Sequence, residues 1–234
     1  VLVESTMKLE KITSIHGRRY DDACGTALGL EILGERWALL VVRELMLGPR
    51  RFGELRASLP GLSANVLTQR LEGLEAAGVL VRRKLPPPAS VQVYELTAWG
   101  YEAEPVILTL GRWAARSPDH DPTLPLSPVS MMLSLRAMFD PAKAGDALVS
   151  IVFRFGETSY RVCVADGALT VERTASEDAC ALVEATPEAV AAVIYSAPAQ
   201  TATLARELLR IEGDETAFLR FTGWFELPAK AERP

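Results

Sequence analysis

Five polar side chains lie within the eight residues from Ser63 to Arg70, and their types suit recognition of base edges in duplex DNA. Asn65 and Gln69 carry amides that can pair bidentately with adenine, and the Arg70 guanidinium can pair with guanine. Thr68 adds a hydroxyl. The alternative is an ordinary solvated helix face, and helix capping alone would explain Ser63. We expect base or phosphate contacts from these five residues as a group.

Basic residues flank this segment on both sides. Residues 50–84 contain seven basic and three acidic side chains, a local charge of +4 in a chain whose net charge is −5. We expect Arg82, Arg83 and Lys84 to contact phosphates or the minor groove, and Arg50 to contact phosphate. The alternative is solvated charge. Such contacts position a protein on DNA without reading its sequence.

Cys24 is a candidate chemical switch. A sensing thiol must be exposed and have a lowered pKa, and Arg18 and Arg19 lie near enough in sequence to supply a favourable field. The simpler interpretation, which we favour, is a small buried residue at a subunit interface. The three cysteines of the chain are far apart, which argues against a disulfide framework and a structural zinc site.

Helices and a strand pair must hold these residues in place. Apolar periodicity predicts helices over 22–33, 37–47, 52–59, between Ser63 and Gly78, and over 97–113, and strands over 79–81 and 91–96. Ser63 should cap the fourth helix, and Gly78 should end it. The prolines at 86–88 are placed at the hairpin tip, and Pro105 should kink the last helix. This order is that of a helix-turn-helix followed by a basic wing.

Four prolines within residues 117–128 predict a semi-rigid linker between two domains. The predicted organisation is an N-terminal arm (1–20), a winged helix-turn-helix domain (21–116), the linker, and a C-terminal α/β domain (129–228). Strands are predicted in that last domain over 148–155, 159–165, 168–174, 180–184 and 207–212, with helices over 187–195, 199–206 and 215–225. The fold class is therefore α+β with more than one domain.

The N-terminal half resembles the HxlR-type winged helix-turn-helix regulators, relatives of the MarR group, over about residues 22–115. The residues that carry the resemblance are Cys24, Gly34, Trp37, Arg51-Phe52, Glu54-Leu55, Ser63, Leu67, Arg70-Leu71, Leu74, Gly78, Tyr94, Leu96-Thr97 and Gly100. The resemblance implies a bacterial or archaeal transcriptional regulator that binds DNA as a homodimer, with residues near 20–33 and 98–114 at the dimer interface. It also implies that Cys24 stands where several relatives sense oxidants. The chain departs from the family pattern at Gly25, where proline is usual.

The C-terminal half more loosely resembles the sterol-carrier-protein-2-like fold, over about residues 130–226. Phe153, Tyr160, Val164, the turn Asp166-Gly167 and the run Ile211-Glu212-Gly213-Asp214 carry this resemblance. It implies an apolar cavity between a sheet and its helices. The cavity that we hypothesise is lined by Val152, Val164, Leu204, Phe221 and Trp224; the alternative is that the aromatic stripe of the last helix is ordinary core.

The sequence lacks clear signals of catalysis, cofactors or membrane insertion. His16 and His120 are the only histidines, neither belongs to a catalytic or metal-ligand pattern, and no glycine-rich phosphate loop is present. No apolar run reaches the ~18 residues of a membrane span, and without an apolar signal core the default location is the cytoplasm. We therefore expect a protein that is not an enzyme and has no cofactor, metal or membrane contact.

We interpret the sequence as a homodimeric, DNA-binding transcriptional regulator with an inverted-repeat operator. Its expected partners are double-stranded DNA, a second copy of the chain and an apolar small-molecule effector bound by the C-terminal domain. The alternative is a carrier of lipids or other apolar ligands whose winged helix serves only dimerisation. A further interpretation keeps the regulator and makes Cys24 its switch.

Overall fold

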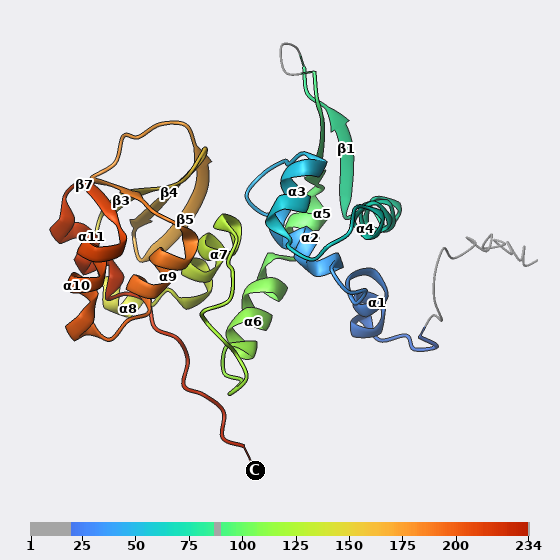
Figure 1. Cartoon of the computed structure of the whole chain (residues 1–234). Helices are drawn as coiled ribbons and strands as arrows, with labels where there is room; N and C mark the ends of the chain where they lie inside the picture. Colours follow the sequence, from blue (N-terminus) through green and yellow to red (C-terminus); the bar gives the residue numbers. More distant parts are fainter. Residues whose placement is uncertain (1–19, 87–89, 234) are drawn as a thin grey trace, which may run out of the picture.

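The computed structural model describes residues 20–86 and 90–233 (Figure 1). Residues 1–19 of the predicted N-terminal arm and residues 87–89 at the predicted proline tip lie outside this range. The N-terminal half contains the following elements: α1 (Gly25–Leu33), α2 (Ala38–Leu45), α3 (Phe52–Ser58), α4 (Ala64–Ala76), β1 (Leu80–Lys84), β2 (Gln92–Leu96), α5 (Ala98–Tyr101) and α6 (Glu104–Ala114). The strands pair antiparallel, and together these elements form the predicted winged helix-turn-helix.

Local sequence explains where α4 and the wing begin. The Ser63 hydroxyl accepts a hydrogen bond from the Val66 N–H, which caps α4. Gly78 has a φ of +78°, a left-handed conformation that glycine adopts without strain, and it directs the chain into β1. Leu67, Leu71 and Leu74 give α4 its buried side.

The sequence predicted one long helix kinked at Pro105, and this prediction is wrong. Pro105 stands in the first turn of α6, and a break at residues 102–103 separates α6 from α5. Proline lacks the N–H that a continuing helix would need and suits the first turn of a new one. The helix predicted over 97–113 is therefore two helices.

The C-terminal half is built on a five-stranded sheet of order β5-β4-β3-β6-β7. Its strands are β3 (Val149–Phe155), β4 (Thr158–Ala165), β5 (Ala168–Thr174), β6 (Ala181–Glu184) and β7 (Arg210–Gly213). β3 and β6 are parallel, and the other pairs are antiparallel. The predicted turn at Asp166-Gly167 joins β4 to β5, with both residues at positive φ. The helices are α7 (Pro128–Met138), α8 (Pro141–Ala144), α9 (Pro187–Ile194), α10 (Pro198–Leu208) and α11 (Glu215–Thr222).

An aromatic cluster fills the space between the sheet and α11. Phe153 of β3 lies with its ring centroid 6.4 Å from that of Phe218 and 6.1 Å from that of Phe221. Phe221 also packs against Trp224, with 5.6 Å between centroids. The aromatic stripe that the sequence placed on the last helix is thus part of the core.

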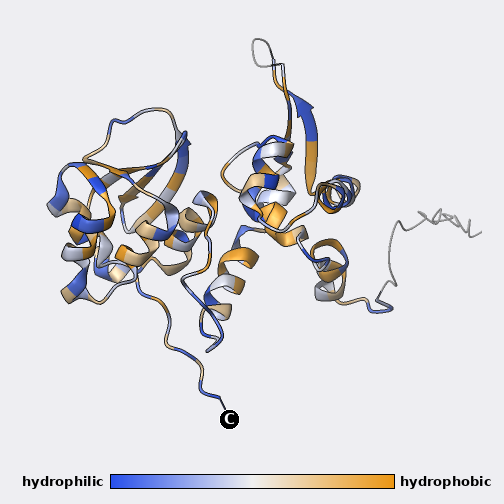
Figure 2. Cartoon of the chain, in the orientation of Figure 1, coloured by the Kyte–Doolittle hydropathy of each residue, from blue (hydrophilic) through white to orange (hydrophobic). Residues whose placement is uncertain are grey.

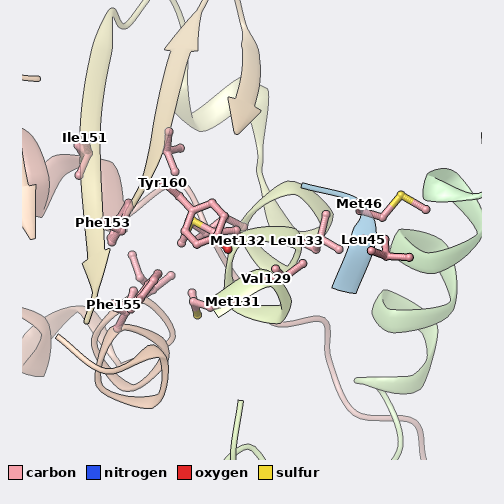
Figure 3. Close-up of a cluster of buried hydrophobic side chains, with 14 of the residues drawn as sticks. Leu45, Met46, Val129, Met131, Met132, Leu133, Ile151, Phe153, Phe155 and Tyr160 are labelled. Carbon is pink, nitrogen blue, oxygen red and sulfur yellow. The ribbon is translucent and has the colours of Figure 1, made fainter. Parts of the chain in front are cut away.

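Helix α7 connects the two halves and was not predicted. Seven of its eleven residues are buried, because it packs against α2 and α6 on one side and against α9 and β5 on the other. Figure 3 shows Val129, Met131, Met132 and Leu133 between Leu45 and Met46 of the N-terminal half and Phe153, Phe155 and Tyr160 of the sheet. The buried apolar side chains consequently form one cluster that runs through both halves. None of the helices in residues 20–86 and 90–233 has the length and apolarity needed to cross a membrane.

Candidate nucleic-acid interface

The polar residues of α4 are on its solvent side. Asn65, Thr68 and Gln69 are exposed and share one face, since residues three and four apart are neighbours on a helix. The Thr68 hydroxyl donates to the Ala64 carbonyl oxygen at 3.0 Å, which leaves its methyl group and oxygen lone pairs for other contacts. Ser63 is exposed at the start of the same helix while it serves as the cap. The structure brings these four predicted residues together.

Arg70 is turned away from that face. Its Nε donates to the Arg36 carbonyl oxygen at 2.9 Å, and its second nitrogen forms an ion pair with Glu35 at 2.9 Å. These partners lie in the loop between α1 and α2, next to Trp37, which has a φ of +80°. A bulky non-glycine residue in this region is strained, and the conformation persists only where its surroundings hold it in place. Arg70 therefore ties α4 to a strained turn.

The wing presents its basic residues on both of its faces. Arg82 pairs with Glu75 of α4 at 2.8 Å and lies over the Tyr94 ring at 5.7 Å. The hydrogen bond that its guanidinium donates to the Glu75 carboxylate raises the pKa of Arg82. Arg83 pairs with Glu95. Among the described residues, no carboxylate forms an ion pair with Lys84. Figure 2 shows the hydrophobic base of β1 near α4 and its hydrophilic far end.

Arg50 is half-buried at the base of the wing. Its side chain is 14% exposed, and its guanidinium contacts the Glu44 carboxylate at 3.0 Å. Its backbone exchanges two hydrogen bonds with Tyr94 of β2, at 2.9 and 2.8 Å. Glu44 was missed by sequence reasoning, although it stands on the apolar side of α2 beside Val41 and Leu45. A charged residue on the apolar side of a helix could have indicated a buried ion pair.

Cys24 is exposed and occupies the N-cap position of α1. The Thr26 backbone N–H, the Thr26 hydroxyl and the Ala27 N–H lower the pKa of the Cys24 thiol. A thiol that is exposed in the single chain suits both a reactive group and a residue that a second subunit covers, so burial at a subunit interface stays a prediction beside the switch. Arg18 and Arg19 lie outside the described residues.

Exposed apolar side chains lie on α1 and on α6, the two regions implied at the dimer interface. Leu28 is 57% exposed on α1, and Val106 and Trp113 are 54% and 69% exposed on α6. Leu30 and Leu110 are also exposed. None of the residues of α6 is buried in the single chain.

The five proposed cavity residues do not line one surface. Val164 pairs with Val149, on the sheet face that Phe153 shares, whereas Val152 pairs with Arg161 and points to the opposite face. Phe221 and Trp224 are buried in the aromatic cluster. Leu204, on α10, is half-buried. Each predicted strand is present, the last one shifted from 207–212 to Arg210–Gly213, but the register places the five residues on different sides of the sheet.

Two different family models match the N-terminal and the C-terminal half of the chain. A family model described as HxlR-like helix-turn-helix matches residues 32–121. A second model, described as alkyl sulfatase C-terminal, matches residues 117–231. The second match is to the C-terminal part of an enzyme and not to a sterol carrier, so the sterol-carrier-protein-2-like assignment is not confirmed.

Two relatives from Bacillus subtilis (strain 168) match the N-terminal half. The uncharacterized HTH-type transcriptional regulator YvaP is 41% identical over 86 residues, which are 36% of this chain and 79% of the relative. The HTH-type transcriptional regulator YodB is 35% identical over 83 residues, 36% of this chain and 74% of the relative. The solved reduced form of YodB is 30% identical, with 43% of this chain and all of that chain covered and a TM-score of 0.38.

These matches confirm the family that the sequence motifs indicated, and they cover the helices and the wing described above. The chain belongs to the HxlR family of helix-turn-helix transcriptional regulators and is a DNA-binding regulator with an added C-terminal α/β region.

Proposed function

We propose that this regulator reads DNA bases with the exposed face of α4 and binds the DNA phosphate backbone with the wing. The observation that carries this proposal is the grouping of Asn65, Thr68 and Gln69 on the solvent side of α4, the helix that precedes the basic strand β1. Amide side chains suit adenine in the major groove. The guanidinium and ammonium groups of Arg82, Arg83 and Lys84 suit phosphates or a narrow minor groove.

The contacts of Arg50 and Arg70 favour a structural role for these two residues over a direct contact with DNA. Both guanidinium groups are held by carboxylates of the protein, and Arg70 is 19% exposed. We propose that they position the wing and α4 instead of reading bases. Ser63 caps α4 and is also exposed. We therefore keep a contact between Ser63 and a DNA phosphate in the proposal.

The exposed apolar residues of α1 and α6 support a homodimer. Leu28, Val106 and Trp113 lie on the elements that the family resemblance implies at the interface, and surface patches of this kind mark association sites. A two-fold dimer would place two copies of α4 about 34–36 Å apart, on successive major grooves of an inverted repeat. Trp113→Asp should convert dimer to monomer in sedimentation measurements while Leu208→Asp, at an exposed site on α10, leaves the dimer intact.

We propose regulation, and not catalysis, as the role of the C-terminal domain. The curated relatives of the N-terminal half are regulators. The five-stranded sheet with helices over its aromatic face supports the sterol-carrier-protein-2-like description. An apolar small molecule stays the proposed effector class, but its site is not assigned to the five residues named above. Thermal melting and DNA affinity with a panel of acyl and aromatic compounds test this part, and insensitivity to the whole panel would contradict it.

The DNA-binding proposal is tested by selecting bound sequences from random duplex DNA with the purified protein. The expected product is an inverted repeat. If each subunit neutralises roughly four phosphates, the logarithm of the affinity should fall with the logarithm of the salt concentration with a slope of about −7. A slope near −1, or selected sequences without two-fold symmetry, would contradict the two-wing mode.

A further inference from the structure

Glu44 is the most deeply buried charged residue of the described chain. The residue is 0% exposed, yet its carboxylate accepts hydrogen bonds from three different side chains. Arg43 donates from Nε at 3.1 Å and from a terminal nitrogen at 2.9 Å. Arg50 donates at 3.0 Å to the other oxygen, and the Ser127 hydroxyl donates at 2.6 Å. A buried carboxylate is tolerated only when such partners replace water.

The Arg50 side of this cluster leads into the wing. The backbone of Arg50 is bonded in both directions to Tyr94 of β2. Tyr94 stands opposite Arg82 in the hairpin, and the Arg82 guanidinium lies over the Tyr94 ring. The next residue, Arg51, begins α3. A shift of Arg50 would therefore move the base of the wing and the first helix of the DNA-binding motif together.

The Ser127 side of the cluster belongs to the C-terminal half. Ser127 is the N-cap of α7, and its oxygen accepts a hydrogen bond from the Ser130 N–H at 3.0 Å. Helix α7 is the element that packs on α2 and α6 and also on the sheet. A second contact supports the same docking, since Arg136 of α7 pairs with Glu104 of α6 at 2.9 Å. Ser127 lies outside residues 32–121, the range matched by the HxlR-like model.

We propose that Glu44 is a positioning residue through which the docked C-terminal domain fixes the wing for DNA binding. The carboxylate is shared between Arg50 and Ser127, so it holds both partners only while α7 is seated on α2. When α7 moves away, Glu44 loses one donor and admits water, and Arg50 is freed to move with Tyr94. This inference rests on the proposed use of the wing to bind phosphates.

The sharpest test replaces Ser127 with residues that separate its two roles. Ser127→Asp retains an N-cap side chain for α7 but sets a second carboxylate against Glu44. Ser127→Thr keeps the hydroxyl. Ala197→Asp is the matched control, because it adds the same charge at the exposed N-cap of α10, within the same domain.

Two readouts are measured on the full chain: hydrogen exchange of the Arg50 and Tyr94 backbone amides, and affinity for the selected duplex as a function of salt. Ser127→Asp should speed both amides and weaken DNA binding by about 10-fold. The salt slope should also become shallower by about 0.9 for each phosphate that the wing no longer neutralises. Ser127→Thr and Ala197→Asp should behave as the parent chain.

Unchanged amide exchange and unchanged DNA affinity in Ser127→Asp would overturn the coupling. A loss of thermal stability without faster exchange at Tyr94 would also overturn it, because Ser127 would then serve docking alone. If Ser127→Asp does not fold, Ser127→Ala removes the same donor without adding charge, and the same readouts decide. A parent chain that binds no duplex would refute the DNA-binding proposal, while the exchange measurement would still decide the coupling.

Discussion

Helices α4 and α7 both begin at a serine N-cap, but they lie in opposite surroundings. The cap of α4, Ser63, precedes a helix with exposed polar residues on one side and leucines on the other. The cap of α7, Ser127, precedes a helix that is apolar nearly all round and is buried between two layers. A helix with one polar face can meet solvent or DNA, whereas a helix that is apolar all round has to be covered. Helix α4 is therefore free to meet DNA, as we propose, whereas α7 joins the two halves.

The largest expected effect comes from a cavity in α7. Leu135 is fully buried, so Leu135→Ala should lower the free energy of unfolding by about 2–5 kcal/mol. Urea denaturation measures the change. A decrease below about 1 kcal/mol would show that α7 is not a packed joint between the halves.

The matching change on α4 should affect binding and leave stability nearly intact. Gln69→Ala removes an exposed amide, so the free energy of unfolding should change by less than about 0.5 kcal/mol. The affinity for the selected duplex should fall by about 1–3 kcal/mol, the contribution of one bidentate base contact.

Gln200→Ala, at an exposed position on α10, is the control for Gln69→Ala and should change neither quantity. If Gln69→Ala binds the selected duplex as tightly as the parent chain does and prefers it over a scrambled duplex to the same degree, Gln69 does not read a base.

The smallest expected effect concerns a third helix start, where a thiol occupies the N-cap. Because hydrogen bonds from the Thr26 N–H and hydroxyl lower the pKa of Cys24, more thiolate is present near neutral pH than for an ordinary cysteine. Alkylation of Cys24 should therefore reach half its maximal rate at a lower pH than alkylation of a free thiol. Thr26→Val should raise that midpoint, since it removes one donor to the thiolate.

The alkylation is measured in a chain with Cys163→Ala and Cys180→Ala, so that one thiol remains. An identical midpoint in Thr26→Val and its parent would show that the Thr26 hydroxyl does not stabilise the thiolate. A midpoint at the value of a free thiol in both would contradict the lowered pKa.

Local chemistry made several parts of this structure predictable from the sequence. Ser63 and Gly78 mark the ends of α4 because a hydroxyl can satisfy a free N–H and because glycine accepts a positive φ. Asp166-Gly167 marks the hairpin between β4 and β5 for the same backbone reason. The family motifs depended on such short-range features and on apolar spacing, so the N-terminal fold and its class of function could be recognised.

Other features depended on groups that are distant in the sequence. Arg50 and Arg70 are cationic residues beside a DNA-binding motif, and only the folded chain shows that Glu44 and Glu35 hold them. Helix α7 has buried residues on nearly every side, so it lacks the one-sided apolar pattern by which helices are recognised.

A winged helix-turn-helix and a strand-rich second half could be predicted from the residues alone, because caps, turns and apolar periods act over a few residues. How the halves meet follows only from the folded chain. The pairing register of β3 and β4 separates Val152 from Val164, and the burial of Glu44 depends on Ser127, 83 residues away. Register and docking are set by packing between distant segments, and no local pattern encodes them.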